Sequence, residues 1–290
     1  MPTKLRRSCG TMAAHMMLLE RYPAYRQNLA RLELATDRMR TRGVHRAAQK
    51  LVTIKVVVNV VWHDAEQNVS KSQIDSQIAV LNRDFRARNS DKKGVPAPWK
   101  GLVGDTLVQF KCAKITRTKT LERMFGVDDG VKRSVSGGIA PYAPRTHLNL
   151  WVCALGGGLL GYAQFPGGPN ATDGVVINSQ AFGSRGTAKA PFNKGRTATH
   201  EIGHYLNLRH IWADTPDCSG SDLVADTPNC AGPNYGTPHW PSISCRNGPN
   251  GDMFMNYMDY VDDDAMFMFT PGQVLRMRAT LAGPRGGLTR

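Results

Sequence analysis

The sequence TATHEIGHYLNLRH, residues 197–210, holds three histidines and one glutamate in a chain that has eight histidines in total. If residues 195–206 form a helix, side chains four positions apart lie on one face of it. His200 and His204 then point the same way, with Glu201 beside them. Two neutral imidazoles on one helical turn form a two-point ligand for Zn²⁺, and the carboxylate can reach a water on that metal. The segment therefore predicts a metal-binding helix.

His210 lies beyond that helix and is the candidate third ligand. It reaches the metal only if the helix ends and the chain turns back, which normally needs a residue with positive φ. Asn207 stands at this point, and asparagine adopts the left-handed conformation often, although glycine does so at lower cost. We therefore predict one zinc ion bound by His200, His204 and His210. The competing interpretation is a helix that carries surface histidines by chance.

Length and composition limit the class of protein. A chain of 290 residues with 41% hydrophobic residues can form one or two sizeable cores, and no apolar run is long enough to span a bilayer. The N-terminus is basic and only weakly apolar, so it is a poor signal peptide. We expect either that a presequence is absent from this chain or that export uses another route.

The net charge of +14 is unevenly distributed. Residues 1–50 carry eleven Lys and Arg against three acidic residues, whereas residues 210–264 carry nine Asp and one basic residue, Arg246. This asymmetry predicts that the two ends attract each other or that the acidic end binds cations. Aromatic and basic residues are not interleaved as they are in proteins that stack on single strands, so we expect no nucleic-acid partner.

The order of predicted elements indicates an α/β (α+β) fold. The first 45 residues or so are predicted to form an Arg-rich helical leader that ends at Gly43. A strand buried on both faces should follow at residues 50–62, and then a helix at 70–89 with a core stripe. The remaining predicted elements are strands at 106–115, 147–155 and 174–179, an edge strand within 156–168, and a helix capped by Thr270 with Pro271 in its first turn.

None of the six cysteines forms a CxxC pair, which argues against a structural zinc site. Cys218 and Cys245 flank an acidic loop region rich in Gly, Pro and Asn, where a disulfide would help most. This placement argues for an oxidising destination, although the residues alone leave the pairing open.

The zinc motif and a downstream methionine together match the metzincin signature. Met258 lies in NYMDY, residues 256–260, and further segments such as SQIAVLNRDFRARN, SDLVADTPNC and FTPGQVLRMR resemble the pappalysin family of metzincin proteases across most of the chain. The resemblance implies a catalytic domain with a twisted mixed sheet and an active-site helix above a cleft, and an irregular subdomain below. We expect a pro-segment at residues 1–50 and a catalytic domain at 51–290, divided into upper (51–207) and lower (208–290) subdomains.

The resemblance also implies roles for the residues of the site. The three histidines would hold zinc, leaving a fourth position for a water that attacks the peptide bond. Glu201 would take the proton of this water and pass it to the leaving amine. Tyr260 would hydrogen-bond the oxyanion, with packing of the turn as the alternative role, and Met258 would form an apolar floor without binding the metal.

We therefore expect a secreted or extracytoplasmic zinc endopeptidase that acts on proteins or peptides. The main alternative is a zinc- or calcium-dependent binding protein without turnover. Glu201 discriminates between them, because a purely binding zinc site has no need for a carboxylate at that position.

Cys9, in the segment RRSCGTM at residues 6–12, resembles the latency cysteine of pappalysin proenzymes. Its thiolate, a strong zinc ligand, would occupy the position that water needs. The pro-segment would then be an internal partner of the catalytic domain. A surface cysteine in a frayed terminus is the competing interpretation.

The turn-rich acidic loops are the expected site of a structural calcium ion, because hard oxygen ligands would order a region that lacks helices and strands. The resemblance points the same way, and solvated acidic loops are the alternative. The candidate ligands are Asp222, Val224, Asp226, Thr227 and Asp252.

The resemblance further places Asp264 in the pocket that receives the residue after the cut bond, where an acid would favour Arg or Lys. Self-processing would then fall between Arg42 and Leu51, with Arg42, Arg46 and Lys50 as targets. A solvated or calcium-binding acidic run is the competing interpretation.

Family members often carry a second cysteine pair at positions that hold Thr237 and Ala265 in this chain. One disulfide is therefore expected to be absent. The pairing that the resemblance retains joins Cys218 to Cys245, and the cysteines expected to be free are Cys112, Cys153 and Cys230.

Overall fold

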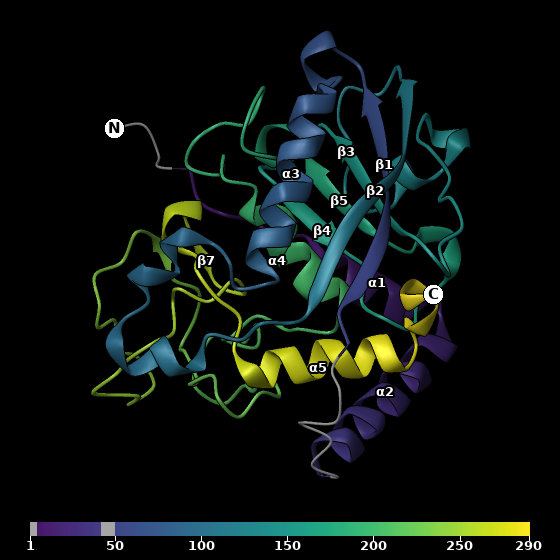
Figure 1. Cartoon of the computed structure of the whole chain (residues 1–290). Helices are drawn as coiled ribbons and strands as arrows, with labels where there is room; N and C mark the ends of the chain where they lie inside the picture. The colour runs from purple at the N-terminus through teal and green to yellow at the C-terminus, as the bar shows by residue number, and fades with distance from the viewer. Residues whose placement is uncertain (1–4, 42–49) are drawn as a thin grey trace.

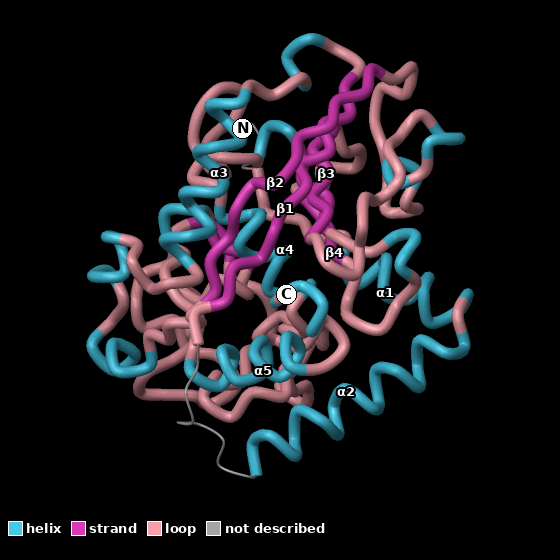
Figure 2. The backbone as a smooth tube through the Cα atoms, turned by 45° about the vertical axis from the view of Figure 1, so that its right-hand side comes forward, coloured by secondary structure: helices cyan, strands magenta, loops and turns pink. Residues whose placement is uncertain are grey.

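The computed structural model describes residues 5–41 and 50–290 and is built on one five-stranded mixed sheet (Figures 1 and 2). The strand order is β2-β1-β3-β5-β4. β1 pairs in parallel with β2 and β3, β3 pairs in parallel with β5, and β4 lies antiparallel to β5 at the edge. The strands are β1 (Val52–Trp62), β2 (Val108–Lys119), β3 (Leu148–Cys153), β4 (Gly161–Ala163) and β5 (Val175–Asn178).

The central strands are buried on both faces, as the continuous apolar run of β1 predicts. Successive side chains along a strand point to opposite faces of the sheet and therefore pack into different cores. Val58 and Leu150 belong to the large core on one face, whereas Val61 and Trp151 belong to a smaller cluster on the other. The predicted α/β class and the predicted edge strand are confirmed.

Three helices contribute to the large core, and Figure 1 shows α5 crossing the lower end of the sheet. Ser70 caps α3 (Lys71–Asp84) through its side chain, and Ile74, Leu81 and Phe85 of the predicted stripe are buried. α4 (Arg196–Tyr205) follows the sheet, and its bounds agree with the predicted metal-binding helix. Thr270 and Pro271 begin α5 (Pro271–Ala282) with the predicted cap.

The N-terminal leader consists of two helices, α1 (Thr11–Arg21) and α2 (Pro23–Thr41). The break falls at Tyr22, because the residue before a proline is disfavoured in the α conformation. α1 packs against β4 and α2 packs against α5 (Figure 1). The predicted end of the leader at Gly43 lies outside the described residues.

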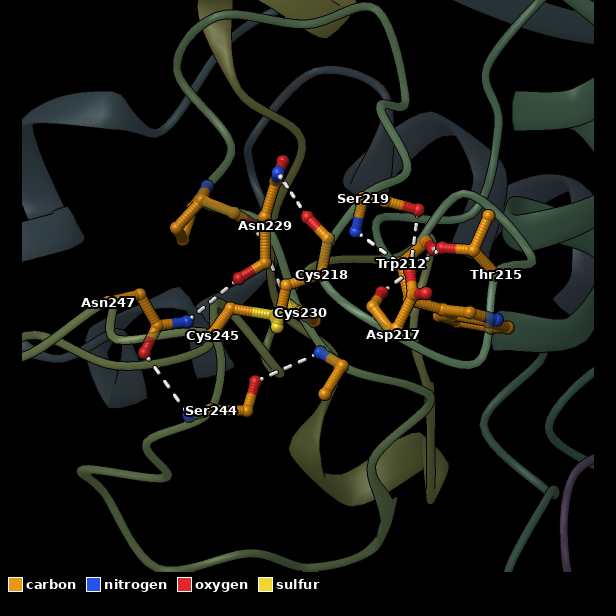
Figure 3. Close-up of a disulfide and its surroundings, with 12 residues drawn as sticks. Trp212, Thr215, Asp217, Cys218, Ser219, Asn229, Cys230, Ser244, Cys245 and Asn247 are labelled. Atoms are coloured by element: carbon orange, nitrogen blue, oxygen red, sulfur yellow. Dashed lines mark hydrogen bonds between the residues drawn. A yellow bond between two sulfur atoms is a disulfide. The ribbon is translucent and has the colours of Figure 1, made fainter.

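The region between α4 and α5 consists of turns, one short 3-10 segment (Asp263–Ala265) and the two-residue strands β6 (Tyr235–Gly236) and β7 (Tyr260–Val261). A disulfide joins Cys218 to Cys245 across this region, as Figure 3 shows. The predicted free cysteines are confirmed, since Cys112, Cys153 and Cys230 carry free thiols. In the described part of the chain, no helix has the length and apolar character needed to cross a membrane.

Candidate metal centre and active-site cleft

α4 presents its two histidines on one face, and the turn that follows returns the third. Asn207 has φ of 76°, so the predicted left-handed residue ends the helix. The backbone N–H of Leu208 donates to the carbonyl of Gly203 at 2.9 Å, which closes the turn. His210 is thereby brought back beside His204.

The three Nε2 atoms of His200, His204 and His210 converge on one point. Their mutual distances are 3.2 Å, 3.0 Å and 3.3 Å. A tetrahedral zinc ion with metal–nitrogen distances of about 2.0–2.1 Å separates its ligands by about 3.3 Å. The arrangement of the donor atoms therefore fits zinc.

The other ring nitrogen of each histidine is tied to an acceptor. The Nδ1 atoms lie 2.7 Å from the carbonyl of Tyr257, 2.8 Å from that of Leu208 and 2.6 Å from the carboxylate of Asp214. A proton on Nδ1 leaves the Nε2 lone pair free for a metal. Burial lowers the pKa of His200 and of His204 well below the usual value, which keeps both rings neutral. Sequence reasoning missed Asp214, which lies four residues after His210.

Cys9 adds a fourth potential ligand to the three histidines. Its Sγ and one nitrogen from each of the three histidines lie within 4.8 Å of one another. A short parallel bridge between Cys9 and Gly161, in β4, holds the thiol at this position. The cysteine singled out in the sequence is therefore at the metal centre and not on a frayed terminus.

Glu201 lies beside this cluster and is buried. Burial raises the pKa of its carboxyl group to about 7, against the opposing effect of hydrogen bonds from Thr11 and Cys9. The Thr11 hydroxyl donates to Oε2 at 2.8 Å, and the Cys9 thiol lies 3.4 Å from the same oxygen. A carboxyl group with a pKa near 7 is suited to take up and release a proton.

Comparisons with known proteins agree with this geometry. The model of the pregnancy-associated plasma protein-A peptidase family matches residues 154–282. An extracellular metalloprotease of Arthroderma benhamiae is 32% identical over 243 residues, which cover 81% of this chain and 80% of the relative. The chain belongs to the pappalysin family of metzincins. It is accordingly a zinc metalloendopeptidase.

Solved structures of a bacterial pappalysin are similar to the chain over most of its length. Mature mirolysin of Tannerella forsythia, in complex with a cleaved peptide, is 46% identical with a TM-score of 0.81, and the match covers 84% of this chain and 97% of that one. Promirolysin of the same organism is 42% identical with a TM-score of 0.88, and the match covers 98% of this chain and 97% of the promirolysin chain.

The turn that holds Met258 packs against α4. Met258 is fully buried, and the space beside its sulfur is so tight that a Cβ on Gly203 would lie 2.4 Å from Sδ. The carbonyl of Tyr257, one residue earlier, accepts from His200. The turn therefore both supports α4 and orients the first ligand.

Tyr260 stands beside the histidines, with ring centroids 4.9 Å from His210 and 5.8 Å from His200. Trp212, which sequence reasoning missed, stacks on His210 at a centroid distance of 4.3 Å and contacts Tyr260 edge-on.

A buried ion pair lies next to the metal centre, but it does not involve the acid named from the sequence. Asp264 is exposed and pairs with Lys194. The buried acid is its neighbour Asp263, whose Oδ1 accepts from Nη2 of Arg7 at 2.6 Å. The 3-10 turn at Asp263–Ala265 buries the first of these two carboxylates and leaves the second exposed.

Arg7 is held by two further acceptors, the carbonyl of Val261 at 3.1 Å and the hydroxyl of Thr197 at 3.1 Å. The side chains of Arg7 and Asp263 are each only 1% exposed. A basic side chain two residues before Cys9 is thus completely enclosed at the metal centre.

The calcium candidates have three different sets of partners. The Thr227 hydroxyl lies 2.7 Å from Asp222 Oδ2 and 3.0 Å from the carbonyl of Val224, so these three oxygens are close together. Asp226 instead accepts from Thr270 and Gly272 at the start of α5. Asp252 lies apart from both and accepts from Ser244 and Asn247.

The turn at Asn207 also contacts the N-terminal leader. Glu33 of α2 pairs with Arg276 of α5 at 2.7 Å, and the Asn207 amide donates to Glu33 at 3.2 Å. Nε of Arg276 donates to the Asn207 carbonyl at 3.2 Å. Asn207 therefore supplies an amide that a glycine at this position would lack.

The contact between Gly203 and Met258 gives a testable prediction. Gly203→Ala should lower the free energy of unfolding by about 1–3 kcal/mol, because the added methyl group displaces a buried side chain. Gly101→Ala is the matched control, since a Cβ there would meet no atom within 4 Å. Urea denaturation of both variants checks this. Equal stability of Gly203→Ala and wild type would contradict the tight contact.

Proposed function

We propose that the chain is a latent zinc endopeptidase in which Cys9 blocks the metal and a buried acid selects basic residues next to the cut bond. The convergence of the Cys9 thiol with three imidazoles carries this proposal. A thiolate in the fourth ligand position excludes the water that peptide hydrolysis requires. The residues before β1 act as the pro-segment.

The metal-binding residues are His200, His204 and His210. Zinc, when bound there, supplies a Lewis acid for water activation. After the pro-segment leaves, Glu201 accepts a proton from the attacking water and delivers it to the leaving nitrogen. Tyr260 donates a hydrogen bond to the oxyanion that develops at the carbonyl.

The comparisons support the division into pro-segment and enzyme. The match with promirolysin covers 98% of this chain, whereas the match with mature mirolysin covers 84%. The additional coverage is of the size of the predicted segment 1–50. The predicted processing targets Arg42 and Arg46 lie outside the described residues, whereas Lys50 and Leu51 are exposed at the start of β1.

Arg7 supports the preference for basic residues. Its guanidinium group is a natural stand-in for the side chain of an Arg or Lys substrate residue, because it fills a closed site next to the metal ligands. A buried carboxylate recognises such a group strongly. We therefore assign the pocket to Asp263, in place of Asp264.

Calcium binding is proposed for the loop at residues 222–227. The grouping of the Asp222 carboxylate, the Val224 carbonyl and the Thr227 hydroxyl supports it, since all three are oxygen ligands of the kind that Ca²⁺ prefers. Burial raises the pKa of Asp222 to about 6, and a bound cation would favour its charged form. Asp226 and Asp252 are bonded to residues outside this loop and are weaker candidates. A calcium titration that leaves the melting temperature unchanged would contradict the proposal.

An extracytoplasmic location is supported by two observations. The relatives in Arthroderma benhamiae and other fungi are named extracellular metalloproteases. The disulfide between Cys218 and Cys245 is typical of an oxidising compartment. The alternative of a binding protein without turnover is disfavoured, because Glu201 is buried at the metal centre where only catalysis needs a carboxylate.

Glu201→Ala should lower kcat of the processed enzyme at least a hundredfold, because the general base is lost. The zinc content should stay near one ion per chain, since Glu201 is not a ligand. Activity on a fluorogenic peptide and metal analysis of the same sample check this, with the exposed Glu122→Ala as control. An active Glu201→Ala enzyme would reject the assigned base.

Asp263→Asn should reduce cleavage before Arg and Lys by roughly tenfold to a hundredfold, because it removes the charge while retaining the shape. Asp264→Asn is the matched control and should leave the preference unchanged. Profiling both variants and the wild type with a peptide library decides between the two positions. A wild-type preference for apolar residues, or loss of the basic preference in Asp264→Asn alone, would contradict the assignment.

A further inference from the structure

The outer edge of β4 is occupied by the N-terminal segment. One side of β4 pairs with β5, which leaves backbone groups on the other side available to another chain. Three of these groups are hydrogen-bonded to residues before and within α1. The bonds join Leu160 N to Ser8 O at 2.9 Å, Gly10 N to Gly161 O at 2.9 Å, and Ala163 N to Thr11 Oγ1 at 2.8 Å.

Thr11 differs from the other two contacts because its side chain, not its backbone, meets the strand. The same hydroxyl donates to Oε2 of Glu201 at 2.8 Å. The direction of each bond is fixed, since the Ala163 N–H can only donate and the hydroxyl proton is then free for Glu201. Thr11 is completely buried, so water does not compete for these partners.

Both partners of Thr11 are needed by a productive substrate complex. Glu201 must receive a proton from water, and an edge N–H binds the carbonyl of an extended peptide. The Thr11 hydroxyl therefore occupies two positions at once. It takes the place of the water beside Glu201 and that of the substrate carbonyl at the edge of β4. We propose that Thr11 is a second latency residue, which acts independently of the thiol of Cys9. This inference rests on the proposed zymogen function.

The position of Thr11 is fixed by close packing of the chain before it. A Cβ on Gly10 would lie 2.5 Å from Cγ1 of Val127, so only glycine fits there. Thr11 begins α1, and the first turn of this helix directs the hydroxyl between Ala163 and Glu201. Removal of the Cys9 thiol alone leaves both hydrogen bonds in place. The uncut Cys9→Ala chain is therefore only partly released from inhibition by the pro-segment.

Initial rates of uncut chains test this proposal on a peptide with Arg after the scissile bond, with mass spectrometry confirming that each chain is intact. Cys9→Ala with Thr11→Val should cleave about tenfold faster than Cys9→Ala alone, because valine leaves two buried polar groups without partners in the blocked state. Cys9→Ala with Thr11→Ser keeps the hydroxyl and should remain at the rate of Cys9→Ala.

The matched control is Cys9→Ala with Thr36→Val, which removes a buried pro-segment hydroxyl that bonds only the carbonyl of Leu32. Its rate should equal that of Cys9→Ala. Zinc content and melting temperature, measured for every chain, separate release of the site from loss of metal or fold. Equal rates with and without Thr11→Val, or equal release by Thr11→Ser, would overturn the proposal. A cut wild-type chain without peptidase activity would instead reject the zymogen proposal on which it rests.

Discussion

The Nδ1 atom of each metal-binding histidine is hydrogen-bonded to a fixed acceptor, and the geometry of the site follows from these three bonds. Two acceptors are backbone carbonyls, of Tyr257 and Leu208, and the third is the Asp214 carboxylate. Each bond fixes the orientation of one imidazole ring so that its Nε2 faces the point where the metal would bind. The methionine turn and the turn after α4 therefore take part in metal binding although neither supplies a ligand.

The N-terminal segment contacts the groups on which hydrolysis depends. Arg7 is paired with Asp263, Cys9 lies among the zinc ligands, and Thr11 is bonded to Glu201. On the proposed function, these five consecutive residues would occupy a side-chain pocket, the fourth ligand position of the metal and the general base. Farther along, α2 binds Arg276 and Asn207 through Glu33, behind the turn that returns His210. A segment of this kind would inhibit by filling the site while leaving the histidines in place.

Short-range patterns predicted the parts of the structure that depend on local chemistry. The bounds of α4, the left-handed Asn207 and the buried strand β1 follow from residue spacing and backbone preference. Residue spacing could not show whether Asp263 or Asp264 is buried, because a single 3-10 turn decides which of two adjacent carboxylates faces inward. The contact between Thr11 and Glu201 spans 190 positions and depends on how α1 meets β4.

X-ray absorption spectroscopy at the zinc edge of the uncut, metal-loaded chain shows directly whether the Cys9 thiolate binds the metal. We expect one sulfur ligand at about 2.3 Å and three nitrogen ligands at about 2.0–2.1 Å. Cleavage of the chain before β1 should replace the sulfur ligand by oxygen or nitrogen. A zinc ion with only nitrogen and oxygen ligands in the uncut chain would show that Cys9 does not block the metal.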